Sequence, residues 1–211
     1  LFGPLIPSSE WAFEDTNIRD LQSEGLDGSD VHICMVDTGI DLSHPALSQV
    51  NLSGFLDLVG SNPDGVPTEY GEDFHGTMMA GILVSTGAFT GISTGSTLSV
   101  AAALGPTGYS VDDGAVGKAI EWCWKTQRAD IISLSLGGEA DPRIEIGGPS
   151  VTAVEDALEA GVIVVAAAGN QGINSTDVST PSSIQRVIAV GATDRSGSVW
   201  VDSSKGAEAM S

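Results

Sequence analysis

Residues 31–39 read VHICMVDTG, and this stretch decides the fold. An apolar run that stops abruptly at Asp37-Thr38-Gly39 is typical of a buried strand followed by a sharp turn. Four similar apolar runs follow along the chain, at 97–104, 129–138, 161–170 and 186–193. Three helical patterns lie between the runs, at 76–84, 111–128 and 150–160. Apolar strands that alternate with helices indicate a parallel sheet that is covered on both faces. We therefore predict a three-layer α/β fold, with a mostly parallel sheet and helices on both faces.

The other segments have weaker patterns. Residues 1–30 are polar and mixed, and residues 51–73 are loop-like because they are rich in Gly, Pro, Asn and Asp. The length of 211 residues fits one domain. Cys34 lies in the first apolar run and Cys123 in a helical pattern between two tryptophans. We expect two free thiols in the core, and a disulfide between them stays open as the alternative.

The chain is strongly acidic, with 28 Asp and Glu against 8 Lys and Arg and a net charge of −20. We expect neither nucleic acid nor an anionic membrane surface as a partner, because both attract positively charged surfaces. The sequence contains no run of about 18 apolar residues that would span a membrane. Two interpretations of the charge stay open: a highly soluble surface, and adaptation to high salt, where ions screen the self-repulsion.

Three polar residues stand at places where chemistry gathers in a parallel sheet. Asp37 follows the first strand, Asn170 follows the fourth, and His75 begins the helix that opens with HGTMMAG. Each has an ordinary structural interpretation as a turn, capping or packed residue. Together they match the needs of acyl transfer: a base, an acid that orients it, and an oxyanion donor. We expect Met78 and Met79 to face the core beneath this helix.

Five segments, in order, resemble the subtilisin-like serine proteases, or subtilases. They are GSDVHICMVDTGIDLSHPAL (28–47), HGTMMAGI (75–82), ADIISLSLGG (129–138), VVAAAGNQG (164–172) and PSSIQRVIAVGAT (181–193). The resemblance implies a serine endopeptidase in which Asp37 orients His75, His75 is the general acid and base, and Asn170 donates to the oxyanion. It also implies a peptide or protein substrate, a propeptide or inhibitor as a further partner, and a secreted or extracytoplasmic location.

The resemblance also implies where a substrate binds. An extended peptide would lie between residues 107–109 and 135–137. Leu104, Tyr109 and Leu136 would form an apolar pocket, which suggests a preference for hydrophobic or aromatic side chains. Ala167, Ala168 and Gly169 would form the pocket next to the scissile bond. The predicted substrate-binding residues are Leu104, Gly108, Tyr109, Ser135, Leu136, Gly137, Ala167, Ala168 and Gly169.

The sequence departs from the family in two places. It contains no Gly-Thr-Ser-Met-Ala segment, which carries the family's nucleophile, and we do not propose Ser211 in its place. Residues 1–211 are thus expected to be an incomplete peptidase domain, either one chain of a cut protease whose missing segment is a second chain, or a shortened form. The alternative is a non-catalytic module that binds peptides or proteins. In addition, the resemblance implies a calcium-binding aspartate at about the position of Ala46, and residues 85–93 lack carboxylates. We therefore expect no metal or other cofactor, and calcium at another site stays open as the alternative.

Overall fold

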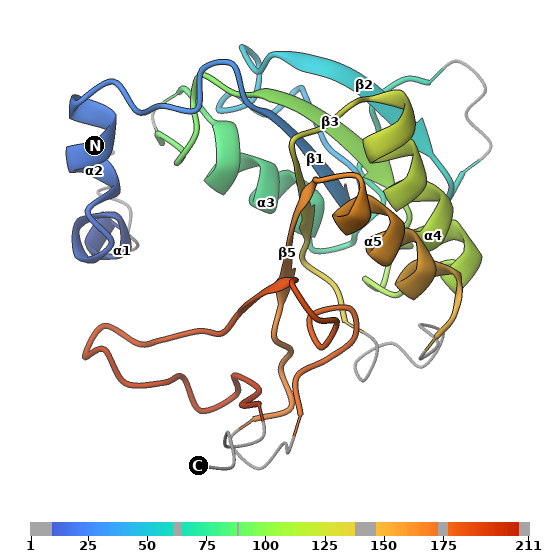
Figure 1. The fold of residues 1–211 in the computed structure, drawn as a ribbon. Coiled ribbons are helices and arrows are strands. Elements are labelled where there is room, and N and C mark those ends of the chain that lie inside the picture. Colours follow the sequence, from blue (N-terminus) through green and yellow to red (C-terminus); the bar gives the residue numbers. More distant parts are fainter. Residues whose placement is uncertain (1–9, 61–64, 88, 138–146, 173–176, 207–211) are drawn as a thin grey trace.

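One six-stranded parallel sheet forms the centre of the fold (Figure 1). The computed structural model describes residues 10–60, 65–87, 89–137, 147–172 and 177–206. The strand order is β2-β3-β1-β4-β5-β6, and every neighbouring pair is parallel. The strands are β1 (His32–Asp37), β2 (Leu52–Asp57), β3 (Thr97–Ala102), β4 (Ile131–Leu134), β5 (Ile163–Ala167) and β6 (Ile188–Val190).

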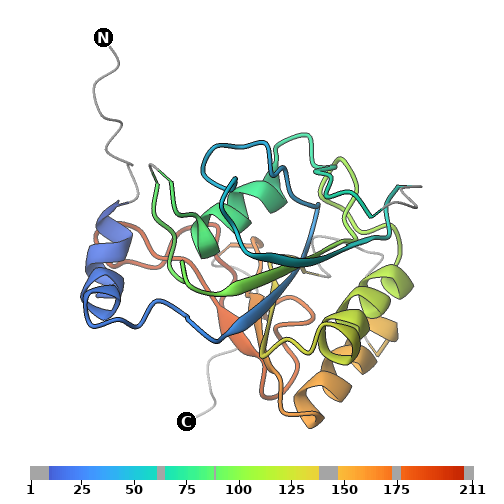
Figure 2. The same ribbon diagram turned by 90° about the horizontal axis from the view of Figure 1, so that it is seen from above.

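Helices cover both faces of this sheet (Figure 2). Helix α3 (His75–Val84) lies on one face, and α4 (Asp113–Glu121) and α5 (Pro149–Glu159) lie on the other. Side chains of β1 alternate between two cores: Ile33 and Met35 pack with α3, whereas Cys34 and Val36 pack with α4 and α5. The predicted three-layer α/β fold is therefore confirmed. None of the helices in the described ranges is long and apolar enough to cross a membrane.

Three elements lie where the sequence showed no regular pattern. Helices α1 (Glu10–Asp15) and α2 (Ile18–Ser23) lie in the mixed N-terminal segment, and β2 lies in the stretch predicted to be a loop. The loop prediction was wrong for 52–57 because β2 is an edge strand that contains Gly54 and has no fully buried residue, so it lacks the continuous apolar run of the central strands. The helix expected at 111–128 consists of α4 and a π-helical turn, η1 (Trp122–Thr126).

The two cysteines form a disulfide rather than free thiols. Cys34 on β1 and Cys123 in η1 are fully buried, and their Cα atoms lie 5.6 Å apart. The expectation of free thiols was wrong because the chain returns over β1 at the end of α4, which places the two side chains in contact in the same core.

Because the disulfide closes a loop of 89 residues, it restricts the unfolded chain strongly. We expect the double substitution Cys34→Ala/Cys123→Ala to lower the free energy of unfolding by about 2–4 kcal/mol. Urea denaturation followed by tryptophan fluorescence measures this change. Reduction of the wild-type protein is the matched control. A double variant as stable as the oxidised wild type would show that the bond adds nothing.

Candidate active site

Asp37 and His75 form a hydrogen-bonded pair at the carboxyl end of β1. Asp37 is the last residue of β1, and His75 is the first residue of α3. The distance from His75 Nδ1 to Asp37 Oδ1 is 2.7 Å. The Asp37 side chain is fully buried, whereas 30% of the His75 side chain is exposed. Because the carboxylate accepts the Nδ1 proton, the Nε2 atom is left for a partner on the exposed side.

The backbone next to this pair brings the end of β1 against the start of α3. Thr38 N donates to Asp37 Oδ1 over 2.7 Å, and Gly76 N donates to Thr38 Oγ1 over 2.8 Å. A side chain at position 76 would overlap the carbonyl oxygen of Gly39. The glycine that follows His75 therefore permits the close approach on which the Asp37–His75 hydrogen bond depends.

The surroundings of His75 favour its protonated form. The hydrogen bond to Asp37 is the largest cause and raises the pKa of His75, while partial burial acts in the opposite direction. The negative charges of Asp37, Asp73 and Glu69 raise this pKa further. His32, in contrast, lies at the other end of β1, and burial lowers its pKa. The two partly buried histidines of β1 and α3 thus have pKa values shifted in opposite directions.

A pocket of about 170 Å³ gathers the other predicted site residues, which come from the ends of β3, β4 and β5. Its lining consists of Leu104, Gly108, Tyr109, Ser135, Leu136, Gly137, Ala167, Gly169, Asn170 and Ser179. Ala168 is buried and is not part of this lining. The structure therefore brings together all the predicted substrate-binding residues except Ala168, and Asn170 with them. Their roles in binding and catalysis stay predictions.

Ser179 is the member of this pocket that the sequence did not reveal. Its hydroxyl donates to Gln171 Oε1 over 3.2 Å, and Gly137 and Gly169 both leave room for its side chain. The loop that carries Ser179 has no periodicity and matches no motif of a catalytic site, so no signal in the sequence could have identified it. Ser179 thus lies against Gly137 and Gly169, which line the same pocket.

Comparison with known proteins identifies the family of this chain. The sequence pattern of the Subtilase family, peptidase S8, matches residues 28–210. The chain belongs to the subtilase family. It is 33% identical over 181 residues to the major intracellular serine protease of Bacillus subtilis (strain 168), and the match covers 82% of this chain and 54% of that protein.

Two further relatives have similar levels of identity. Serine protease AprX of Bacillus subtilis (strain 168) is 33% identical over 199 residues, which cover 87% of this chain and 43% of that protein. Subtilisin J of Geobacillus stearothermophilus is 34% identical over 194 residues, which cover 89% of this chain and 47% of that protein. The chain thus spans about half the length of the curated relatives it matches.

Helix α3 of this subtilase carries an exposed apolar stripe beside His75. Phe74, Met78 and Ile82 are 55%, 52% and 37% exposed, and together with Phe89 they line a groove of about 710 Å³. The expectation that Met78 faces the core was therefore wrong, whereas Met79 does pack against the core. The reason is that α3 is apolar on nearly all sides, so its periodicity does not identify the buried face.

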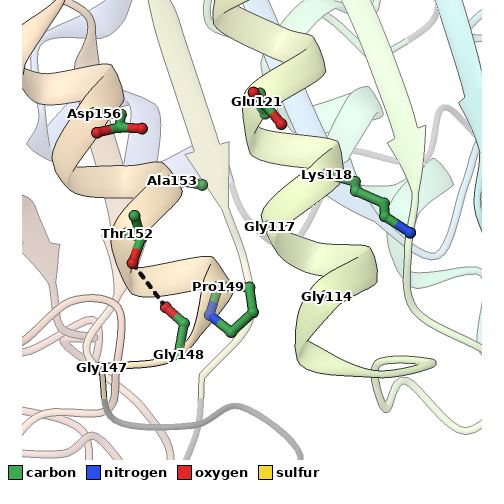
Figure 3. A pocket seen from close by; sticks show the side chains of 10 residues that line it. All are labelled: Gly114, Gly117, Lys118, Glu121, Gly147, Gly148, Pro149, Thr152, Ala153 and Asp156. Carbon is green, nitrogen blue, oxygen red and sulfur yellow. Dashed lines mark hydrogen bonds between the residues drawn. The ribbon is translucent and has the colours of Figure 1, made fainter.

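A separate pocket of about 570 Å³ lies between α4 and α5 (Figure 3). Small residues line most of it, and Thr152 Oγ1 donates to the carbonyl of Gly148 over 3.3 Å. Lys118 points away from the gap between the two helices. None of the predicted site residues lines this pocket, which is therefore not part of the candidate active site.

In the described part of the loop after α3, where relatives of this subtilase are expected to hold calcium, side chains of α2 contact three backbone carbonyls. Arg19 Nη2 donates to the carbonyl of Thr90 over 3.2 Å. Gln22 Nε2 donates to the carbonyls of Gly91 and Ile92 over 2.7 and 2.9 Å. Side chains of α2, one of them a guanidinium, thus already engage the oxygens that a calcium ion would need. That the whole protein requires no cofactor stays a prediction.

Asp37→Asn tests the cause of the raised His75 pKa. We expect the pKa of His75 to fall, because the hydrogen bond to the carboxylate is the largest cause that raises it. NMR titration of the imidazole ring protons measures the pKa, with the exposed His44 as an internal control.

Stability should follow the same pair. A raised folded-state pKa means that protonated His75 stabilises the fold at acidic pH, and that this contribution is lost as the pH rises through the raised pKa. The Asn variant should show a weaker pH dependence, because only the charges of Asp73 and Glu69 then still raise the pKa of His75. An unchanged His75 pKa in the variant would contradict the assignment.

Proposed function

We propose that this chain is the larger, N-terminal part of a serine endopeptidase that hydrolyses peptide bonds. The observation that carries the proposal is the hydrogen bond from His75 Nδ1 to the fully buried Asp37 carboxylate. The pair lies at the carboxyl end of a central strand. The pocket that Asn170 lines also lies at the carboxyl ends of the strands. Membership of the subtilase family supports the same activity.

Each residue has a defined role in the proposed reaction. The serine oxygen attacks the carbonyl carbon of the scissile bond while His75 Nε2 takes the serine proton. Asp37 stabilises the imidazolium that forms, and His75 then gives this proton to the amine of the leaving peptide. The side-chain amide of Asn170 donates to the oxyanion of the tetrahedral intermediate. Water hydrolyses the resulting ester by the same sequence of proton transfers.

The substrate is proposed to bind as an extended strand between residues 107–109 and 135–137. Gly108, Tyr109 and Ser135 to Gly137 all line the pocket, so a peptide laid there contacts both stretches of backbone. Leu104, Tyr109 and Leu136 favour a hydrophobic side chain on the substrate. An inhibitor or a propeptide would occupy the same groove in the same extended form.

The nucleophile is proposed to come from a segment outside this chain. The apolar stripe of Phe74, Met78 and Ile82 lies beside His75 and offers a surface on which such a segment can pack. Strand β6, at the end of the sheet, leaves the side chains of Ile188 and Val190 half exposed, which supports a further covering element. The matched relatives are longer than this chain, since the matches cover 54% and 43% of their lengths, and this fits the same interpretation.

A secreted or extracytoplasmic location is proposed for the protein. The disulfide between Cys34 and Cys123 supports it, because such bonds persist in oxidising compartments. The net charge of −20 is compatible with high salt in that environment.

The experiment that tests the activity measures kcat and KM of the intact enzyme on an extended peptide with a hydrophobic side chain. We expect Asn170→Ala to lower kcat by roughly 10²–10³, a figure measured for the oxyanion asparagine of a subtilisin and taken over here. His75→Ala should abolish cleavage. Asn51→Ala is the matched control. Asn51 lies just before β2, at the amino end of the strands and thus opposite to the site, so its substitution should leave kcat unchanged.

Two results would contradict the proposal. Unchanged kcat in Asn170→Ala would remove the oxyanion role of that residue. If the intact protein binds the peptide without cleaving it, the chain is better described as a non-catalytic binding module. The missing Gly-Thr-Ser segment would then explain why no cleavage occurs.

A further inference from the structure

Glu69 lies before α3 and reaches the first turn of that helix with its side chain. Glu69 Oε2 accepts hydrogen bonds from Thr77 N and from Thr77 Oγ1, both over 2.7 Å. Its other oxygen, Oε1, accepts from Gly71 N over 2.8 Å. The Glu69 carboxylate therefore has three donors, two of them on a residue that is itself two positions after His75.

The segment that carries Glu69 is fixed on both sides. Its backbone pairs with the residues that follow Asp37, through Tyr70 N to the Thr38 carbonyl over 2.9 Å and Ile40 N to the Thr68 carbonyl over 3.2 Å. Tyr70 also donates its hydroxyl to Asp57 Oδ2 over 2.6 Å at the end of β2, and burial together with this bond raises the pKa of Tyr70 to about 12. Glu69 is thus held between the end of β1 and the start of α3.

The start of α3 depends on side chains from outside the helix. Phe74, at the capping position, has a positive φ of 57° and supplies no side-chain hydrogen bond. Instead His75 N donates to Asp73 Oδ1 over 3.2 Å, Gly76 N to Thr38 Oγ1, and Thr77 N to Glu69 Oε2. Free N–H groups at a helix start need such acceptors, and a negative charge there is favourable. Glu69 thus brings a carboxylate to the first turn of the helix from eight residues before Thr77.

Thr77 extends this contact to the other side of the site. Its hydroxyl donates to Glu69 and accepts from Asp41 N over 2.9 Å, four residues beyond Asp37. Thr77 is 7% exposed, so these bonds are largely shielded from water. The carboxylate of Glu69 therefore connects its own segment, the first turn of α3 and the turn after β1.

We propose that Glu69 is a positioning residue for His75, which holds the imidazole in place against Asp37 and keeps a negative charge beside it. It acts through the start of α3 and does not touch the reacting atoms. The proposal deepens the proposed peptidase function, on which its catalytic part rests. Among the described residues, no ion pair joins Glu69 to a lysine or arginine, so its charge is balanced by N–H and O–H donors of the site itself.

Three carboxylates act on the imidazole: Asp37 at the end of β1, Asp73 two residues before α3, and Glu69. All three raise the pKa of His75. Asp37 acts by a direct hydrogen bond, whereas Asp73 and Glu69 act through their charge. A glutamine at position 69 would keep the size of the side chain and remove the charge. Its amide nitrogen would also fail to accept from Thr77 N or Gly71 N.

Glu69→Gln and Glu72→Gln form a matched pair for the test. Each substitution removes one negative charge, and the two positions are only three residues apart in the sequence. They differ because Glu72 is exposed. We expect Glu69→Gln to lower the NMR-measured pKa of His75 clearly more than Glu72→Gln does. In the intact enzyme, Glu69→Gln should lower kcat by roughly tenfold or more with little change in KM, because small displacements of a catalytic group cost large factors in rate.

Equal pKa shifts in the two variants would overturn the proposal, since only the net charge would then matter. If Glu69→Gln does not fold, Thr77→Val and Thr77→Ser test the same contact with the charge of Glu69 intact. The proposal expects a fall in kcat for Thr77→Val and recovery with Thr77→Ser, which keeps the hydroxyl. Wild-type kcat in Thr77→Val would overturn it.

The two proposals fail in different ways. An intact protein without peptidase activity, in which Glu69→Gln still lowers the pKa of His75, would sink the proposed function and leave the positioning role. An active peptidase in which Glu69→Gln changes neither the pKa of His75 nor kcat would sink only the positioning role.

Discussion

The hydrogen bond between Asp37 and His75 is the interaction on which the rest of the site depends. A fully buried carboxylate is costly unless donors satisfy it, and here Thr38 N and His75 Nδ1 both donate to Oδ1 of Asp37, whereas Oδ2 has no hydrogen-bond partner among the described residues. The His75 donor reaches Asp37 only where the end of β1 meets the start of α3. The close contact of Gly76 with Gly39 and the hydrogen bonds at the first turn of α3 can be understood as the means of holding that meeting point.

The parallel sheet explains why the candidate cleft lies at the carboxyl ends of the strands. β1 stands between β3 and β4, and β5 follows β4, so the segments after these four strands leave the sheet side by side. These segments supply Asp37, the pocket walls after β3 and β4, and Asn170 after β5. The fold thus brings to one side of the molecule residues that lie up to 133 positions apart in the sequence, from 37 to 170.

Apolar runs made the sheet and its order of elements predictable, because strands buried on both faces leave little choice of residue. β2 escaped prediction since an edge strand with Gly54 lacks that signal. The side of α3 that carries Met78 was predicted wrongly because α3 is apolar nearly all round. The Cys34–Cys123 pairing and the place of Ser179 depend on contacts between distant segments, which one sequence does not encode locally. Motifs found Asp37, His75 and Asn170, whereas Glu69 became visible only through its contacts.

The central claim is that Asp37 and His75 of this chain activate a serine that lies outside residues 1–211. The most direct measurement is reaction of the intact protein with a fluorophosphonate, which labels serines activated by a neighbouring base, followed by peptide mapping under denaturing conditions. We predict one adduct, on a serine beyond Ser211 or on a second chain, and its loss in His75→Ala. An adduct on a serine within residues 1–211, or a folded protein that forms no adduct, would contradict the account.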